Sequence, residues 1–258
     1  MGTVAKALSL LSHFNLSRPE IGLSDMARLS DMNKATVFRL LSELETGGFV
    51  EQIGTTRAYR LGSGFLRLAT LRDAAVPLRS VAGAVLDALC AATDETVHMS
   101  LLQGQHLNAL AHRYSGTHAT RVTMEDAAEL SFHATSSGLA VLAFADPAFV
   151  DSVLSSPLRV FTKDTKINPD QIRAALGSIR QTGVAESIGG FEVDVHSHAA
   201  PVFGPDMRPI GALAVAAPVS RMTGRTRTVI QQQVAEQALE LTKQTGGFCP
   251  PDFPISHD

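Results

Sequence analysis

Residues 23–62, LSDMARLSDMNKATVFRLLSELETGGFVEQIGTTRAYRLG, contain the pattern that decides the fold of the first part of the chain. Two short helices are predicted there, one with Ser24 as its N-cap and the next capped by Asn33. A turn of about four residues separates them, which is the spacing of a helix-turn-helix. The second helix ends at Gly47 and carries one apolar stripe at helical spacing: Val37, Leu40, Leu41 and Leu44.

The residues on either side complete a larger unit. Residues 4–14 repeat apolar side chains every three or four positions, as an amphipathic helix does. Residues 49–61 form two short strand-like runs around Gly54 and indicate a hairpin. A helix, a helix-turn-helix and a hairpin in this order describe a winged helix, which we assign to residues 1–61. The alternative is a small helical bundle used for dimerisation, but such a bundle has no need of the hairpin.

The outward face of the helix that follows Asn33 suits the major groove of DNA. When the apolar stripe is turned inward, Arg, Thr and Lys side chains are left on or beside the exposed face. Arg can pair with guanine, Thr can contact phosphate or a thymine methyl group, and Lys can neutralise phosphate. Arginines on the hairpin can follow the adjacent backbone or minor groove. The predicted DNA-contacting residues are Lys34, Ala35, Thr36, Phe38, Arg39, Arg57 and Arg60.

Charge is divided unevenly along the 258 residues, whose net charge is -3. Residues 1–72 hold nine Lys and Arg against six Asp and Glu, a net charge of +3, which leaves -6 for residues 73–258. A small basic part joined to a larger acidic part fits a nucleic-acid reader attached to a domain with another partner. A difference of a few charges also arises by chance, so the charge alone does not decide the function.

The composition excludes several classes of protein. Hydrophobic residues make up 45% of the chain, but no apolar run approaches the roughly 20 residues of a membrane helix. The first residues lack the apolar core and cleavage site of a signal peptide. Cys90 and Cys249 have no CxxC partner, so neither a disulfide framework nor a structural zinc site is expected. We expect a cytoplasmic protein with no membrane partner.

The rest of the chain has an α+β pattern. Residues 62–76 are predicted as a linker helix, residues 77–246 as a second domain, and residues 247–258 as a flexible tail rich in proline. Within the second domain, predicted helices and mostly antiparallel strands alternate. The helices begin near 77, 136, 169 and 223, and the strands cover 96–102, 107–111, 184–186, 193–203 and 210–217.

The segment from His133 to Gly138, HATSSG, is the one most suited to binding chemistry in this domain. Hydroxyl groups followed by glycine at a helix start leave free N–H groups and the positive end of the helix dipole, where a carboxylate can bind. The alternative is that Thr135 or Ser136 only caps its helix. From these residues alone, both interpretations remain open.

Several stretches together resemble the IclR-type bacterial transcription regulators. The run at residues 23–62 resembles their winged helix, and ETVHMSLLQGQ, FHATSSGLAVLAF and HAAPVFGPDMRPIGALAVAAPVSRMT follow in the family's order, so the resemblance covers about residues 4–246. It implies a homodimer or tetramer on a pseudo-palindromic operator. It also implies a GAF-like C-terminal domain, an antiparallel sheet with flanking helices, that binds a small metabolite and changes operator affinity. Regulators of this kind often control a neighbouring catabolic operon.

The resemblance also implies an effector pocket at the helix start and on two strands. Carried over by position, the predicted effector-binding residues are Met99, Ser136, Ser137, Gly138, Ser197, Ala214 and Ala216, with Met99 as the weaker candidate. This chain has Ser197 where the family usually has cysteine, and Ala214 and Ala216 where serine is frequent. With fewer hydroxyl donors the pocket is expected to be more apolar, which does not suit a small polar keto acid. We expect an effector that is organic-acid-like or aromatic.

Asp194, His196 and His198 alternate, so on a strand they share one face. Two histidines at this spacing can chelate zinc, but a metal needs three or four ligands, which other histidines would have to supply in space: His98, His112 or His133. We predict hydrogen-bonded histidines, no metal and no cofactor. The enzymatic alternative is a metal-dependent hydrolase built on His196 and His198, which leaves the winged helix unexplained. No GxSxG, P-loop or HExxH motif is present, so we expect no enzyme.

Overall fold

The computed structural model describes residues 2–15, 18–75, 78–124 and 127–254. They form two compact units, residues 1–77 and residues 78–258. No helix in these described ranges is long and apolar enough to cross a membrane.

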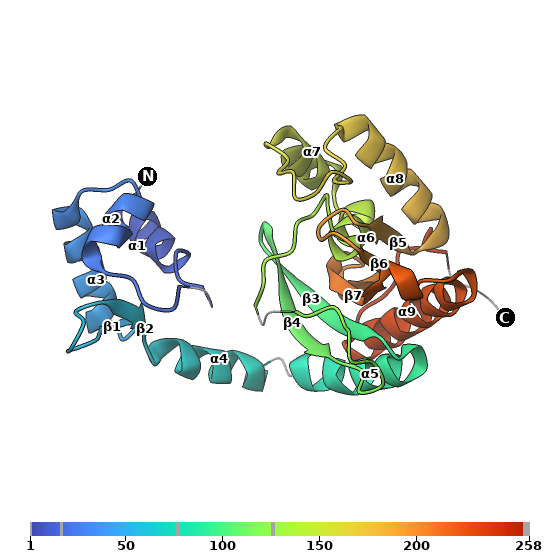
Figure 1. Cartoon of the computed structure of the whole chain (residues 1–258), viewed down its shortest axis with the longest axis horizontal. Coiled ribbons are helices and arrows are strands. Elements are labelled where there is room, and N and C mark those ends of the chain that lie inside the picture. Colours follow the sequence, from blue (N-terminus) through green and yellow to red (C-terminus); the bar gives the residue numbers. More distant parts are fainter. Residues whose placement is uncertain (1, 16–17, 76–77, 125–126, 255–258) are drawn as a thin grey trace. The chain divides into compact units, whose positions relative to one another are not determined.

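The first unit is a winged helix (Figure 1). Helices α2 (Leu23–Leu29) and α3 (Lys34–Thr46) form the helix-turn-helix, and α1 (Thr3–Leu11) packs against α3. Strands β1 (Val50–Gln52) and β2 (Tyr59–Leu61) pair antiparallel, and α4 (Gly64–Ala75) follows them. The predicted order of helix, helix-turn-helix and hairpin is therefore confirmed.

The core of this unit is formed by the apolar faces of its three N-terminal helices. Leu10, Met26, Val37 and Leu41 are fully buried, and the Tyr59 ring of β2 covers them with 1% of its surface exposed. The whole predicted stripe of α3 is buried, with none of its side chains more than 8% exposed. Full burial of one such side chain contributes about 1.5–3 kcal/mol, so this stripe fixes which face of α3 points outward.

The two predicted helix caps have different outcomes. The Asn33 side chain accepts a hydrogen bond from the backbone N–H of Thr36 over 2.8 Å, which confirms it as the cap of α3. The prediction for Ser24 is wrong, because α2 begins at Leu23 and its N-cap, which makes no side-chain bond, is Gly22, two residues before Ser24. The first helix also ends earlier than its apolar pattern predicts, at Leu11, and Val4 in that pattern is 73% exposed.

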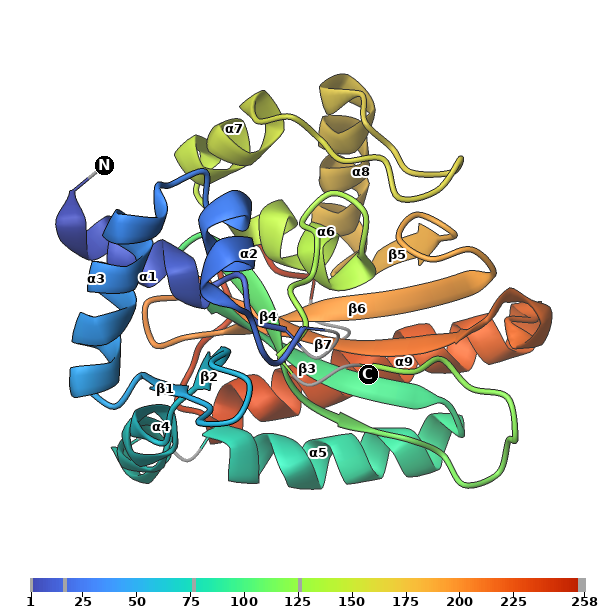
Figure 2. The same ribbon diagram turned by 60° about the vertical axis from the view of Figure 1, so that its left-hand side comes forward.

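The second unit is a five-stranded antiparallel sheet in the order β4-β3-β7-β6-β5, with helices on both faces. Figures 1 and 2 show α5 and α9 together on one face, α6 on the other, and α8 beside α6. This arrangement confirms the α+β class. The strands are β3 (Thr96–Gln103), β4 (His106–Arg113), β5 (Ala185–Ile188), β6 (Val195–Phe203) and β7 (Pro209–Pro218); the helices are α5 (Leu78–Thr93), α6 (Ser136–Phe144), α7 (Pro147–Ser155), α8 (Pro169–Thr182) and α9 (Gly224–Gln244), with a 3-10 turn at Val219–Arg221.

Alternation along the strands assigns side chains to two sheet faces, which we call the α6 face and the α9 face. Ala199 and Ala214 pack with α6, whereas Ala200, Val215 and Met99 pack with α5 and α9. Helix α6 is apolar on all sides, and every residue from 136 to 143 is buried. A helix of this kind is held in the interior, so its N-terminus is fixed against the sheet.

Two parts of this unit differ from the sequence-based expectation. Helix α7 is absent from that expectation because it is only one amphipathic segment of nine residues, with Val150 and Leu154 as its buried side chains. The predicted flexible tail is packed over residues 247–254: the Phe253 ring lies 5.2 Å from the rings of Phe144 and Phe203. The prolines of this segment led to the prediction of a flexible tail, although its Phe253 side chain packs on the second unit. Residues 255–258, and Pro77 as the predicted start of a helix, lie outside the described residues.

Candidate functional site

The exposed face of α3 presents the residues that the sequence places there. Lys34, Ala35 and Arg39 are exposed, Thr36 is half-buried, and the Phe38 ring is 51% exposed. The Asn33 cap fixes the first turn, and the N–H groups of a helix N-terminus favour a negatively charged partner. The face thus combines a hydroxyl, an apolar ring and two cations on one rigid element.

The hairpin carries the other two predicted arginines. Arg57 is exposed and has a φ of 57°, the left-handed region that costs a residue other than glycine about 1–2 kcal/mol. Its N–H closes the turn on the Ile53 carbonyl over 2.8 Å. Arg60 donates to Glu51 on the neighbouring strand, with 2.5 Å between Nε and Oε1. Its charge is therefore partly neutralised, a feature that its place in the sequence does not show.

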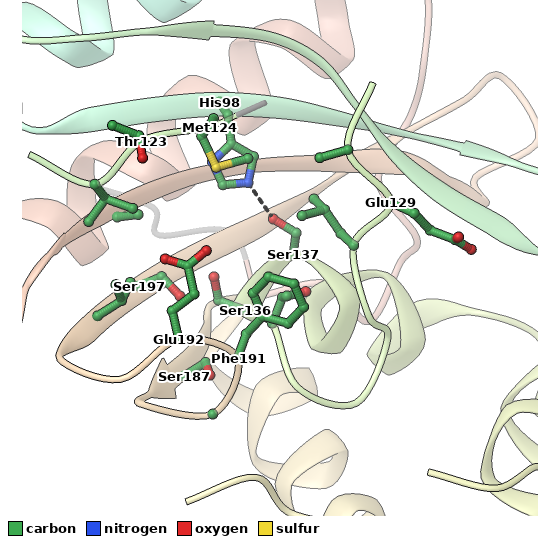
Figure 3. Close-up of a pocket in the computed structure, with 17 residues that line it drawn as sticks. His98, Thr123, Met124, Glu129, Ser136, Ser137, Ser187, Phe191, Glu192 and Ser197 are labelled. Atoms are coloured by element: carbon green, nitrogen blue, oxygen red, sulfur yellow. Dashed lines mark hydrogen bonds between the residues drawn. The ribbon is translucent and has the colours of Figure 1, made fainter. Parts of the chain in front are cut away.

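A cavity of about 320 Å³ lies in the second unit, between the α6 face of the sheet, the N-terminus of α6 and two loops (Figure 3). Four of the seven predicted effector-binding residues line it, which are Ser136, Ser137, Ser197 and Ala216. The first two come from α6, and the others pair with each other across β6 and β7. The remaining lining residues are His98, Val122, Thr123, Met124, Ala128, Glu129, Leu130, Thr135, Ser187, Gly190, Phe191, Glu192 and Val195.

Hydrogen bonds at the start of α6 show which residue caps this helix. The Thr135 hydroxyl accepts from the Gly138 N–H over 3.0 Å and donates to the Ser131 carbonyl over 2.7 Å, so Thr135 is the cap. Ser136 and Ser137 therefore occupy the first two helical positions, whose N–H groups have no partner inside a helix. Their backbone and hydroxyl groups form a polar corner in a wall whose exposed area is mostly apolar.

His98 of β3 completes that polar corner. Its Nε2 lies 3.1 Å from the Ser137 hydroxyl, the contact marked in Figure 3. Burial, with a smaller contribution from the charge of His112, lowers the pKa of His98 to about 4, so the ring is neutral at pH 7. Its buried Nδ1 has no hydrogen-bond partner within the described part of the chain. The ring can thus give or take a hydrogen bond without adding charge.

The charged groups of the cavity wall are acidic. Glu129 and Glu192 line it, but the Glu129 carboxylate pairs with the exposed His106 and points away from the cavity; none of the described lining residues is Lys or Arg. Figure 3 shows Glu192 and Phe191 entering from the loop after β5. Burial raises the pKa of Glu192, which is the effect of bringing a carboxylate toward an apolar space. A ligand carboxylate would therefore depend on the α6 N-terminus and on neutral donors.

Three predicted effector-binding residues are placed elsewhere. Gly138 packs against the preceding loop, where a Cβ atom would collide with the Ser131 carbonyl and with Phe132 Cα. Glycine is therefore needed here so that the start of α6 can approach the loop backbone closely. Ala214 lies under α6 in the core and does not line the cavity. Met99 is on the α9 face, because it is one residue out of phase with His98. Met99 therefore does not line the cavity.

Sequence reasoning missed most of the cavity wall. His98 belongs to the quoted ETVHMSLLQGQ motif, but only the phase of β3 shows that it, and not Met99, faces the cavity. The loops that contribute Met124 and Phe191 have no periodicity that could identify them. Alternation along β6 does predict that Ser197 points away from the side of His196 and His198, and the structure confirms this separation.

His196 and His198 lie on the α9 face and contact Glu186 of the neighbouring strand. Both rings are buried, and burial lowers the pKa of His198. They take no part in the cavity, so the residues of the predicted hydrolase site and of the predicted effector site belong to opposite sides of the sheet.

A winged helix followed by a second unit with a ligand-sized cavity is typical of DNA-binding transcription regulators. Comparison with known families makes the assignment specific. Residues 3–54 match the IclR helix-turn-helix domain, and residues 73–243 match the C-terminal domain of the bacterial transcriptional regulator IclR. The chain belongs to the IclR family of bacterial transcription regulators.

Individual relatives agree over nearly the whole chain. An IclR transcriptional regulator from Silicibacter sp. TM1040 is 56% identical, with 98% of this chain and all of that chain covered and a TM-score of 0.94. An IclR homologue from Microbacterium hydrocarbonoxydans, solved with 4-hydroxybenzoate, is 25% identical over 94% of this chain and 100% of its own, with a TM-score of 0.76. The transcriptional repressor IclR of Escherichia coli is 26% identical over 95% of this chain and 90% of its own length.

Proposed function

We propose that this regulator binds a small organic acid in the cavity of its second unit and that binding changes the affinity of the winged helix for a pseudo-palindromic operator. The supporting observation is the cavity itself, in which Ser136 and Ser137 at a buried helix N-terminus meet apolar walls. The relative from Microbacterium carries 4-hydroxybenzoate, an apolar ring with one carboxylate. Such a molecule matches both parts of the wall.

The charges of the wall narrow the class of effector. Glu192 faces the cavity, and no lysine or arginine appears among the described lining residues, so a second carboxylate on the ligand would be repelled without compensation. We infer a monocarboxylate with an apolar or aromatic body. The carboxylate would accept from the N–H groups at the start of α6, and the neutral His98 ring would supply one further hydrogen bond.

Thermal unfolding tests the effector class. We expect benzoate or 4-hydroxybenzoate to raise the Tm, since a ligand at about 100 times its Kd adds about 2.7 kcal/mol to the folded state. Terephthalate, which has a second carboxylate on the same ring, should leave the Tm unchanged. A panel of monocarboxylates that neither raises the Tm nor changes operator binding would contradict the assignment, as would a preference for the dicarboxylate.

In the DNA-binding unit, we propose that Lys34, Ala35, Thr36, Phe38 and Arg39 enter the major groove and that Arg57 and Arg60 follow the adjacent backbone. The exposure of these α3 residues and the rigid cap support this orientation. The left-handed conformation of Arg57 at the hairpin tip also supports a role there, because glycine would adopt it without cost. We further propose that the protein acts in the cytoplasm, on an operator of a neighbouring catabolic operon, and not as an enzyme.

The ion pair on the hairpin leads to a prediction for Glu51. Replacing Glu51 by Gln should free Arg60 for phosphate and remove a repelling charge. We expect tighter operator binding, by roughly threefold to tenfold at low salt, and a salt dependence steeper by about one phosphate contact per chain. The fold should be unaffected, because exposed ion pairs contribute little. Glu236→Gln removes the same charge from the exposed side of α9 and is the control; equal effects of the two variants would contradict the prediction.

Exposed leucines on α4 support a homodimer. Leu66 is 73% exposed and Leu71 is 58% exposed, although α4 directly follows the DNA-binding hairpin. We propose that a second copy of the chain covers them. The double variant Leu66→Glu/Leu71→Glu should shift the mass in light scattering toward the monomer and weaken operator binding. Val160→Glu, at an equally exposed position of the second unit, should keep the wild-type mass; an unchanged mass in the double variant would exclude α4 from the interface.

A further inference from the structure

A second group of potential ligands lies on the α9 face of the sheet, outside the cavity. Glu186 of β5 is paired in register with His198 of β6, and His196 is two residues away on the same face. One oxygen or nitrogen atom from each of the three lies within 4.8 Å of the other two. The neighbours in each strand, Ser187 and Ser197, point the other way and line the cavity. The group therefore lies apart from the effector cavity.

The three ligand atoms converge on one point. The Glu186 Oε1 lies 2.7 Å from His196 Nε2 and 3.2 Å from His198 Nε2, and the two imidazole rings are stacked with centroids 4.9 Å apart. In a tetrahedral zinc site with bonds of about 2.0–2.1 Å, neighbouring ligand atoms are about 3.3 Å apart. Small side-chain rotations would open the present arrangement to that spacing.

His198 gives the independent sign that a ligand belongs here. Its side chain is fully buried, and neither ring nitrogen has a hydrogen-bond partner in the described part of the chain, although Nε2 is close to Glu186. A buried polar atom without a partner costs about 1–3 kcal/mol. A cation held between the three side chains would bind the lone pair of Nε2 and remove this cost for that nitrogen, with the proton on Nδ1.

The surroundings fit a site that admits a metal from solvent. Arg227 of α9 donates to the other carboxylate oxygen of Glu186 over 2.8 Å, and so holds Oε1 toward the histidines. A ligating carboxylate is ordinarily held in this way by an outer hydrogen bond. The Glu186 side chain is 28% exposed while the two rings are buried, so one side of the cluster is open for entry and for a water ligand.

We propose that Glu186, His196 and His198 form a binding site for one divalent transition metal, with zinc as the probe. Two imidazoles and a carboxylate are a ligand set that zinc and similar borderline ions take. The third ligand comes from a strand that precedes the histidines in sequence, and not from another histidine. A bound ion would tie β5 to β6 on the side opposite the effector cavity.

Zinc binding by tag-free, chelator-treated protein tests the proposal. We expect one zinc per chain in competition with a chromophoric chelator, and a higher Tm with zinc than without it. Glu186→Gln and His196→Gln should each weaken the affinity more than about 100-fold, beyond the range of outer-ligand variants. His106→Gln is the matched control, because His106 contacts Glu129 in an exposed pair that has no third ligand atom among the described residues. It should bind zinc like the wild type.

Cobalt binding by the wild-type protein tests the same site without any variant, and so remains informative if a variant fails to fold. Cobalt added to the wild-type protein should give a visible absorption band that saturates at one equivalent and disappears when zinc is added. A wild-type protein that binds neither ion stoichiometrically, or binding that survives in both ligand variants, overturns the proposal. Ser197→Phe, which fills the cavity, should still bind zinc, so failure of the effector assignment and failure of the metal site are distinguishable.

Discussion

Glutamate in place of Ala35 is expected to abolish operator binding while the winged helix remains folded. Ala35 is exposed at the second position of α3, in the turn that we propose enters the major groove. A carboxylate there would face the phosphates and acceptor atoms of DNA in both subunits of a dimer. Like charges brought together at an interface cost several kcal/mol, so we expect a loss of more than about 100-fold in affinity.

The same substitution should not harm the fold. The wild-type methyl group is exposed, so no packing is lost, and the first turn of α3 contains no acidic residue. A carboxylate near a helix N-terminus is stabilising by about 0.3–1 kcal/mol. We therefore expect an unchanged or slightly higher Tm. A loss of operator affinity without a loss of thermal stability distinguishes a direct effect on DNA binding from unfolding of the variant.

Gel shift and fluorescence anisotropy with the operator measure the loss. Ala35→Gln is the control, because it adds nearly the same volume without the charge. If the Gln and Glu variants weaken operator binding equally, the loss is caused by the size of the new side chain and not by its charge. The proposed approach of the α3 N-terminus to DNA then needs revision. If both bind like the wild type, α3 is not the recognition helix.

The second large effect is expected from Ser197→Phe, which should remove the response to the effector. Ser197 is half-buried on β6, lines the cavity and lies on the face opposite the histidines. A phenyl ring at this position would occupy much of the 320 Å³ available to a ligand. We expect a loss of roughly 100-fold or more, about 3 kcal/mol, in affinity for benzoate or 4-hydroxybenzoate, because a steric clash in a binding site acts directly against the ligand.

Calorimetry measures the affinity of the variant for the aromatic acid, and gel shift without the acid measures its operator binding. Operator binding in the absence of ligand should stay at the wild-type level, since the substitution lies in the second unit. Met99→Leu is the matched control: it conserves volume on the α9 face of the same sheet and should leave the ligand response intact. A Ser197→Phe variant that still responds fully would exclude this cavity as the effector site.

The winged helix could be predicted because its signals are local. The stripe from Val37 to Leu44 is a 3.6-residue period, and the Asn33 cap acts on a group only three residues away. The Arg60 pair is different. Its partner Glu51 is nine residues away across a hairpin, and only the register of β1 with β2 places the two side chains opposite each other.

The cavity was predicted in part, from resemblance to the family rather than from periodicity. Ser136, Ser137, Ser197 and Ala216 line it, whereas the position assigned to Met99 is one residue out of phase. A shift of one residue on a strand exchanges the two sheet faces, and a run such as VHMS, buried on both sides, has no polar alternation that fixes the phase.

The sequence by itself determined the winged helix, the α+β class of the second unit and a helix start near residue 136, because capping and periodic burial act between residues close in the chain. The tertiary structure decided which side of the sheet each polar residue faces. His98 joins Ser137 across 39 positions, and Glu186 reaches the two histidines through strand pairing. These contacts depend on sheet register and on the packing of α6 and α9, which are set by the whole core and not by any one segment.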